Sequence, residues 1–202
     1  MRIGGYQPVS LSDYPGRIAA VVFTQGCNFR CPFCHNRRLW PDAAHPGQLL
    51  AEAEVLERLD RRRGKLDSVV ISGGEPTLQP DLACFLSKVR RLGFAVKLDT
   101  NGSRPDVLRE LLAARLLDFV AMDIKAPWHK YELLAGVAVN TTDIATSMQM
   151  LAASGIPHEF RTTVPPGLLN EDDLAGIRAI LPPGSPHRRQ SYRRVRRPGN
   201  LR

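Results

Sequence analysis

The stretch Gln25–Asn36 reads QGCNFRCPFCHN, and it holds three of the four cysteines of the 202-residue chain. It follows an apolar run rich in β-branched residues, 18–24, which is typical of a strand buried on both faces. Gly, Asn and Pro within the stretch disfavour regular structure, so we expect the cysteines to lie in a loop directly after this strand. Thiols gathered this closely in a loop indicate a bound metal or redox group.

Cys27, Cys31 and Cys34 are spaced C-x3-C-x2-C, which favours an iron–sulfur cluster because thiolates are soft ligands suited to iron. Three cysteines can hold three irons of a cubane cluster and leave the fourth iron open to a substrate. Zinc with His35 as fourth ligand is an alternative, although adjacent Cys34 and His35 are unlike the separated ligand pairs of structural zinc sites. Residues 31–35 also match the C-x-x-C-H pattern of c-type haem attachment, which normally requires export and leaves Cys27 unexplained. The remaining alternative is a set of reduced, buried cysteines.

Strand-like and helix-like segments alternate along the rest of the chain. The expected strands are 18–24, 67–71, 94–98, 117–122 and 158–164, and the expected helices are 48–63, 80–92, 105–115, 141–154 and 170–181. Repeating β-α units of this length predict an α/β fold with a parallel sheet and helical crossovers. Residues 1–17 are expected to be irregular or hairpin-like. A sixth strand would follow at 187–192, but HRRQSY is too polar for a buried strand, so this strand stays in doubt.

The fourth cysteine, Cys84, is separate from the other three. It lies in the expected helix 80–92 beside Leu82, Phe85 and Leu86. We interpret it as a small buried hydrophobic residue.

Polar and glycine-rich stretches follow three of the expected strands. Because the carboxyl ends of parallel strands meet at one edge of a sheet, these stretches are expected to lie beside the cysteine loop. The two glycines of SGGEP, residues 72–76, would let backbone carbonyls approach a ligand ammonium, and Glu75 would add a charge-assisted acceptor. Taken alone, each stretch fits an ordinary turn or a solvated charge pair as well. The residues concerned are Gly73, Gly74, Glu75, Asp99, Thr100, Asn101, Met122, Asp123 and Lys125.

The spacing Cys27-x3-Cys31-x-Phe33-Cys34 resembles the signature of the radical S-adenosylmethionine (SAM) superfamily, including the aromatic residue before the third cysteine. The sequence CHN at residues 34–36 is similar to the enzymes that activate glycyl-radical enzymes, and most of all to the anaerobic ribonucleoside-triphosphate reductase activating proteins. The SGGEP stretch resembles the family's GGEP motif. The resemblance extends over residues 10–180 in order. It implies a partial (β/α)6 radical SAM barrel, open on one side, as domain 1–182.

The resemblance also implies cofactors and the residues that hold them. A [4Fe-4S] cluster would be held by the three loop cysteines, and SAM would bind beside it. Phe33 and the backbone near His35 would border the adenine, and Lys125 would meet the SAM carboxylate. The SAM amino group would be held by Gly73, Gly74 and Glu75. A candidate monovalent-cation site would be lined by Asp99, Thr100, Met122 and Asp123, and Asn101 lies in the same stretch as the first two.

A reaction follows from the same resemblance. An electron from a flavodoxin or ferredoxin would drive reductive cleavage of SAM, and the resulting 5′-deoxyadenosyl radical would take a hydrogen atom from a glycine of a partner enzyme. Anaerobic ribonucleotide reductase is favoured as that partner. The alternatives are a radical SAM enzyme acting on a small molecule, such as a deazapurine precursor, and a non-enzymatic metal-binding module with a nucleic-acid tail. For Arg161, in the expected strand 158–164, the sequence leaves open an orientation into the barrel and a pairing near Glu159.

The net charge of +8 is concentrated at the end of the chain. Seven of the 28 basic residues are arginines within 188–202, which leaves 21 basic against 20 acidic residues elsewhere. The body is therefore near neutral, and binding of nucleic acid is not expected of it. Residues 183–202 are expected to form an Arg-rich tail, disordered or an aberrant coding end, with a basic arm for an acidic partner as the alternative. The absence of a membrane-spanning apolar run and of a secretory signal in the sequence predicts a cytoplasmic location.

Overall fold

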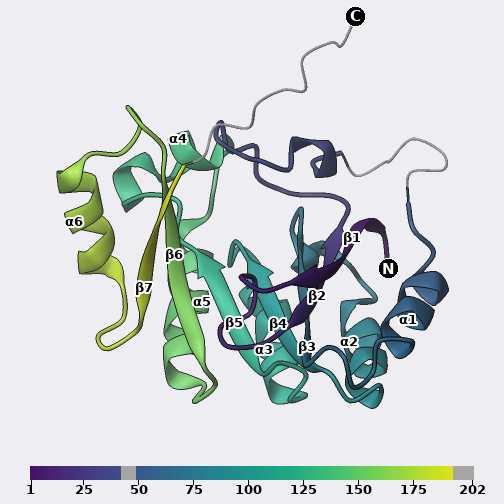
Figure 1. Ribbon diagram of the computed structural model, residues 1–202. Helices are drawn as coiled ribbons and strands as arrows, with labels where there is room; N and C mark the ends of the chain where they lie inside the picture. The colour runs from purple at the N-terminus through teal and green to yellow at the C-terminus, as the bar shows by residue number, and fades with distance from the viewer. Residues whose placement is uncertain (42–48, 193–202) are drawn as a thin grey trace, which may run out of the picture.

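A seven-stranded sheet forms the centre of the computed structural model, which describes residues 1–41 and 49–192 (Figure 1). The strands follow one another in space in chain order. The first strand is antiparallel to the second, and every later neighbour is parallel. The strands are β1 (Ile3–Ser10), β2 (Ala19–Thr24), β3 (Ser68–Gly73), β4 (Ala95–Thr100), β5 (Phe119–Asp123), β6 (His158–Val164) and β7 (His187–Ser191).

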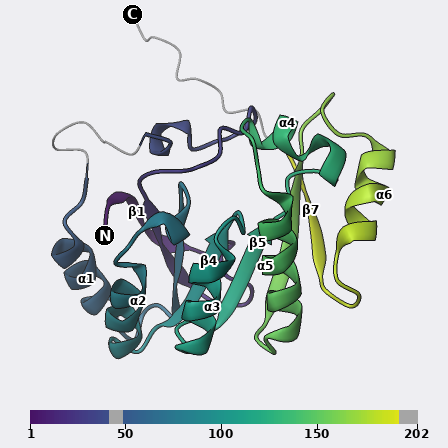
Figure 2. The ribbon, with the colours of Figure 1, turned by 180° about the vertical axis from the view of Figure 1, so that it is seen from behind.

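Helices connect the parallel strands and cover one face of the sheet, as the view from behind shows (Figure 2). They are α1 (Glu52–Asp60), α2 (Leu82–Arg91), α3 (Pro105–Ala113), α4 (Tyr131–Ala135), α5 (Thr141–Ala153) and α6 (Glu171–Ile180). Short 3-10 turns occupy Arg37–Leu39, Pro76–Leu78 and Trp128–Lys130. Asn140 caps α5 through its side chain, and Asn170 and Asp173 form a reciprocal capping box at the start of α6. No described helix has the length and apolar character needed to cross a membrane.

The alternating β-α pattern predicted from the sequence is confirmed. The strands expected at 18–24, 67–71, 94–98, 117–122 and 158–164 correspond to β2 to β6, and the expected long helices to α1, α2, α3, α5 and α6. The short helix α4 was not predicted. The six parallel strands β2 to β7 and their helices form the expected partial (β/α)6 barrel, with β1 added at one edge.

The doubt about a sixth parallel strand is resolved, because β7 pairs with β6 from Phe160↔His187 to Val164↔Ser191. Its polar sequence is compatible with a strand because β7 lies at the edge of the sheet, where most of its side chains face solvent. Arg188 contributes an ion pair of 2.9 Å with Glu159. Residues 187–191 are therefore not the disordered tail that we expected from residue 183 onward, whereas residues 193–202 lie outside the described part of the chain.

The connection between β1 and β2 lies across the other, concave face of the sheet (Figure 1). Its Tyr14 is 5% exposed and packs with Val21 and Val70, and its ring centroid lies 5.7 Å from that of Phe119. The hairpin-like start expected for residues 1–17 is thus confirmed. The hairpin also closes the base of the concave face with a small apolar cluster.

The interpretation of Cys84 as a buried residue is wrong. The buried side of α2 consists of Leu82, Phe85, Leu86 and Val89, and Cys84 is exposed. At 3.6 residues per turn, position 84 falls on the solvent side of the stripe that these residues define.

Candidate functional site

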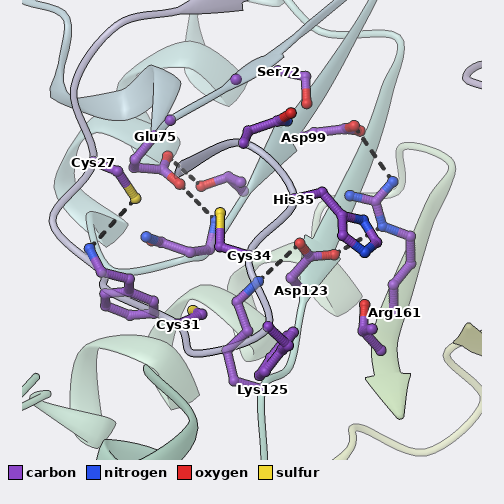
Figure 3. A pocket seen from close by; sticks show the side chains of 18 of the residues that line it. Cys27, Cys31, Cys34, His35, Ser72, Glu75, Asp99, Asp123, Lys125 and Arg161 are labelled. Atoms are coloured by element: carbon purple, nitrogen blue, oxygen red, sulfur yellow. Dashed lines mark hydrogen bonds and ion pairs between the residues drawn. The ribbon is translucent and has the colours of Figure 1, made fainter. Parts of the chain in front are cut away.

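A cavity of about 340 Å³ lies at the carboxyl ends of the parallel strands (Figure 3). It brings together the cysteine loop after β2 and the ends of β3, β4, β5 and β6, as expected for a parallel sheet. All but one of the predicted site residues line it. Those that do are Cys27, Cys31, Phe33, Cys34, His35, Gly73, Gly74, Glu75, Asp99, Thr100, Asn101, Asp123 and Lys125.

The three loop cysteines are free thiols that face this cavity. The backbone N–H of Cys34 donates to the carbonyl of Cys31 at 3.0 Å, which closes a tight turn between two of them. The N–H of Phe29 donates to Cys27 Sγ at 3.4 Å. Among the described residues no three His, Cys, Asp or Glu side chains converge closely enough to hold a single metal ion.

Burial favours the protonated form of two of these thiols, Cys27 and Cys31, in the protein without a bound group. It raises the pKa of Cys27 to about 12, and the nearby Glu75 carboxylate adds to the shift. Burial also raises the pKa of Cys31, although the Lys125 ammonium opposes the shift. Both groups are therefore neutral thiols at pH 7 until a metal displaces their protons.

Gly73 and Gly74 are required by the packing of two backbones. A Cβ on Gly74 would overlap the carbonyl oxygen of Gly26, and one on Gly73, whose φ is +121°, would overlap the backbone of Thr24. The close approach is held by the N–H of Glu75, which donates to the Gly26 carbonyl at 2.8 Å. The glycines therefore allow the end of β3 to pack against the start of the cysteine loop. The motif alone did not suggest this structural reason for glycine at positions 73 and 74.

Glu75 is 1% exposed, and its carboxylate accepts four hydrogen bonds from the protein itself. Thr77 donates from its N–H at 3.1 Å and from its hydroxyl at 2.6 Å. The Thr100 hydroxyl and the Asn101 N–H each donate at 2.7 Å. Burial raises the pKa of this carboxyl, while the four donors favour its charged form and oppose the shift. Glu75 thus joins the turn after β3 to the end of β4.

Asn101 extends this network to the cysteine loop. Its side-chain amide donates to Asn28 Oδ1 at 2.9 Å, and Asn28 Nδ2 donates to the Ser103 hydroxyl at 2.8 Å. The Ser103 hydroxyl in turn donates to Asn101 Oδ1 at 2.7 Å. The loop is therefore held from the side of β4 as well as from the side of β3.

A row of paired charges borders the cavity on β4, β5 and β6 (Figure 3). Arg161 Nη1 lies 3.4 Å from Asp99 Oδ2, and Arg161 Nε donates to Asp123 Oδ1 at 2.9 Å. Lys125 Nζ donates to Asp123 Oδ2 at 3.0 Å. Burial disfavours the charged form of Asp123, but Arg161 and Lys125 outweigh it and hold the pKa of that carboxyl well below its usual range.

Arg161 is the charged residue whose place the sequence left open, and it lies in the cavity rather than pairing near Glu159. The alternation of β6 was the available signal: Phe160 and Thr162 are buried on one face, so Arg161 between them must face the other. The cavity is also lined by residues that were not among the predicted site residues, namely Asp13, Phe23, Phe29, Asn36, Trp40, Ser72, Thr163 and Gln190.

Met122 is the predicted site residue that does not reach the cavity. It is fully buried, and its terminal methyl group fills the space beside Gly102. Thr100, another member of the predicted cation site, directs its hydroxyl to Glu75. Asp99, Thr100 and Asp123 border the cavity, whereas the Met122 side chain lies outside it. The monovalent-cation site implied by the resemblance remains a prediction.

His35 and Phe33 border the cavity from the cysteine loop. Phe33 is buried, whereas His35 is exposed and its ring stacks on Tyr192, with centroids 5.2 Å apart and planes at 22°. Tyr192 directly follows β7, so this stack connects the loop after the first parallel strand to the last strand of the sheet. No motif or periodicity in the sequence indicates this contact.

Comparison with known sequences and structures places this geometry in a family. The profile of the Radical SAM superfamily matches residues 21–177. The chain is 34% identical over 180 residues to MJ1227 of Methanocaldococcus jannaschii, which is named as a glycyl-radical enzyme activating enzyme, covering 87% of this chain and 73% of the relative. It is 31% identical to pyruvate formate-lyase 1-activating enzyme of Escherichia coli, covering 86% and 72%. A 7-carboxy-7-deazaguanine synthase of Hyperthermus butylicus is 38% identical over 48% of this chain and 40% of that protein.

Solved structures show the same fold at low sequence identity. SuiB of Streptococcus suis, bound to its precursor peptide SuiA, superposes with a TM-score of 0.67 at 16% identity over 86% of this chain and 38% of that one. QueE of Escherichia coli superposes with a TM-score of 0.53 at 16% identity over 94% and 93%. The chain therefore belongs to the radical SAM superfamily, whose members are enzymes that use a [4Fe-4S] cluster and S-adenosylmethionine.

Proposed function

We propose that this protein activates a glycyl-radical enzyme by forming a radical on a glycine of that partner. The observation that supports this most is the likeness to MJ1227 along 87% of the chain, together with the arrangement of the CHN-bearing loop and the strand ends around one cavity. The E. coli relative, named as a pyruvate formate-lyase activating enzyme, agrees with the same class of partner. Among such partners, anaerobic ribonucleotide reductase is our choice because of the similarity of the cysteine loop.

The residues at the cavity suit an iron–sulfur cluster. Cys27, Cys31 and Cys34 are soft ligands on one loop, and the Phe29 N–H directed at Cys27 Sγ is the type of hydrogen bond that supports a cluster thiolate. These three cysteines would hold the cluster. When cluster and SAM are bound, they supply the one-electron cleavage that generates the radical acting on the substrate.

The remaining residues orient the ligand and shield the site. The Lys125 ammonium borders the cavity and would donate to the SAM carboxylate. The backbone carbonyls of Gly73 and Gly74 would accept hydrogen bonds from the ammonium group of SAM. Phe33 and the backbone near His35 would border the adenine. Glu75, with all four of its interactions inside the protein, would act by holding Asn101 and the turn after β3 in place rather than by binding SAM directly.

The partners proposed are a glycyl-radical enzyme and a one-electron carrier, either flavodoxin or ferredoxin. A cytoplasmic location remains our prediction. Mixing the reconstituted protein and SAM anaerobically with anaerobic ribonucleotide reductase, and in parallel with pyruvate formate-lyase, tests the partner. An EPR doublet of a glycyl radical with the reductase alone is the expected result. To identify the electron carrier, the yield of glycyl radical is compared with reduced flavodoxin, with reduced ferredoxin and with dithionite as the electron donor.

The control is Cys31→Ala, which should lose both the cluster and the release of 5′-deoxyadenosine. A doublet with pyruvate formate-lyase only would correct the choice of partner. SAM cleavage without a glycyl doublet in either mixture would overturn the activase function. It would favour the second candidate, a small deazapurine substrate, which the likeness to the H. butylicus synthase supports over about half of the chain.

A further inference from the structure

Lys97 is a charged residue placed inside the molecule, below the cavity just described. It lies on β4 two residues before Asp99, so both side chains point to the concave face of the sheet. Its side chain is 1% exposed, and its ammonium lies 5.9 Å from the centroid of the Phe119 ring. Within the described residues its hydrogen-bond partner is Asp99 Oδ1. An ammonium at this depth is costly to bury unless a carboxylate compensates it.

Asp99 is bound on both sides. Lys97 occupies Oδ1, and Arg161 lies 3.4 Å from Oδ2. The two pairs continue through Asp123 to Lys125, so the row of charges alternates in sign from the buried base of the cavity to its border. Three cations and two carboxylates take part. Neither carboxylate oxygen of Asp99 is left facing the cavity without a cationic partner.

Strand geometry explains why these charges meet. Asp123 and Arg161 are register partners on the neighbouring strands β5 and β6, which places the guanidinium beside the first carboxylate. Asp99 lies one strand further along the sheet, within reach of the same guanidinium (Figure 3). Lys97 alone approaches this row from the apolar base, where Phe119 and Tyr14 exclude water.

We propose that Lys97 is a positioning residue whose ammonium is the built-in counter-ion of Asp99. By neutralising Asp99 from below, it fixes Arg161 beneath the ligand and makes a dissolved metal cation unnecessary at this carboxylate. The ligand is SAM if the proposed function holds, and the role of Lys97 in the protein without cofactors does not depend on it. The inference concerns a residue that neither the motifs nor the cavity lining identified.

Chemical rescue of Lys97→Ala tests this in the cluster-free protein. The substitution leaves a space beside Asp99 that a small alkylammonium ion can enter. Thermal unfolding is measured at equal ionic strength in choline, potassium and methylammonium chloride. We expect the same Tm for the wild type in all three salts. For Lys97→Ala we expect a Tm lower by roughly 5 °C in choline, and recovery of most of that loss in methylammonium.

Lys65→Ala is the matched control, because Lys65 is exposed. Its Tm should stay close to that of the wild type and should not respond to methylammonium. A Tm of Lys97→Ala that is no higher in methylammonium than in choline would overturn the counter-ion role. A wild-type Tm that rises in potassium relative to choline would show that an inorganic cation is still needed, and would overturn it as well.

A double-mutant cycle keeps the inference testable if Lys97→Ala does not fold. Lys97→Met and Asp99→Asn should each lower the Tm, and the double variant should lose less than the sum of the two. An additive loss would contradict the pairing.

SAM affinity of the reconstituted protein provides the functional measurement. Lys97→Met should weaken SAM binding by about tenfold, which corresponds to about 1.4 kcal/mol, with little change in turnover at saturating SAM. Unchanged SAM affinity would limit Lys97 to packing and contradict the positioning role. The salt-rescue measurement needs neither cluster nor SAM, so a failure of the activase proposal leaves it intact.

Discussion

At the scale of single residues, the hydrogen bonds of Glu75 lead to a prediction about stability. Its carboxyl group accepts four hydrogen bonds in a site that is 1% exposed. In Glu75→Gln an NH2 group would face donors that need an acceptor. We expect a loss of about 1–3 kcal/mol in the free energy of unfolding, measured by urea denaturation of the cluster-free protein.

The matched control for this variant is Glu57→Gln on the exposed side of α1, where Glu57 is 61% exposed and pairs with Arg61 at the surface. Its effect should stay within about 0.5 kcal/mol. Equal effects of the two substitutions would show that the network around Glu75 does not contribute to stability.

The loop thiols predict a pH dependence of cluster assembly. Burial raises the pKa of Cys27 to about 12 and raises that of Cys31. Binding of iron requires the thiolates, so protons compete with iron, and the competition weakens as the pH rises. We expect the iron bound per chain in anaerobic reconstitution at limiting iron to increase steadily from about pH 7 to about pH 9. A flat profile would contradict the control of assembly by these protons.

The types of the site residues could be read from the sequence, but several of their contacts could not. The cysteine spacing and the strand-end motifs identified more than half of the cavity residues. The motif did not show that Glu75 turns inward to Thr77 and Asn101, since that depends on how two turns meet in space. In the same way, no motif in the sequence indicated that Lys97 pairs with Asp99 inside the molecule.

At the scale of elements, β7 connects the end of the sheet to the cysteine loop through the stack of Tyr192 on His35. An aromatic pair of this kind contributes about 0.5–1.5 kcal/mol beyond buried area. In Tyr192→Ala, we expect faster hydrogen exchange at the amide of Cys34, whose N–H is bonded to the Cys31 carbonyl. Mass spectrometry of the deuterated peptide covering residues 31–36 measures this in the cluster-free protein.

Tyr192→Phe is the control, because it keeps the ring and should exchange at the wild-type rate. If Tyr192→Ala exchanges as slowly as the wild type, the stack does not restrain the loop.

The same strand shows the limit of sequence reasoning at this scale. The polar sequence of residues 187–191 argues against a buried strand. However, β7 is an edge strand, paired on one side only, and an edge strand can carry polar side chains. Helix caps such as Asn170 were predictable because they depend on nearest neighbours.

At the scale of the whole molecule, the concave face is closed at its base by the hairpin that precedes β2. Tyr14 packs there on Val21, Val70 and Phe119, with 5% of its surface exposed. Tyr14→Ala should lower the free energy of unfolding by about 3 kcal/mol, because it removes a buried ring and leaves a space. Leu11→Ala in the same loop is the control, since Leu11 is 77% exposed and its loss should be close to neutral. Similar losses for both variants would contradict the closing role of Tyr14, and denaturant titration measures them.

The architecture was largely predictable because its signals are repeated along the chain. Alternating β-α units specify the order of β2 to β6, and a parallel order then collects the strand-end motifs at one edge. The hairpin over the concave face was not predictable in the same way. Tyr14 and Phe119 are more than a hundred positions apart in the sequence, and no local sequence pattern predicts their contact.

The exposed thiol of Cys84 is a site for selective chemical labelling of the protein. It lies on the solvent side of α2, away from the stripe that packs on the sheet. Once iron occupies the other three cysteines, Cys84 is the thiol left open to a maleimide reagent. A single fluorophore or nitroxide can therefore be attached there, and the docking of a large partner could be followed from the labelled helix.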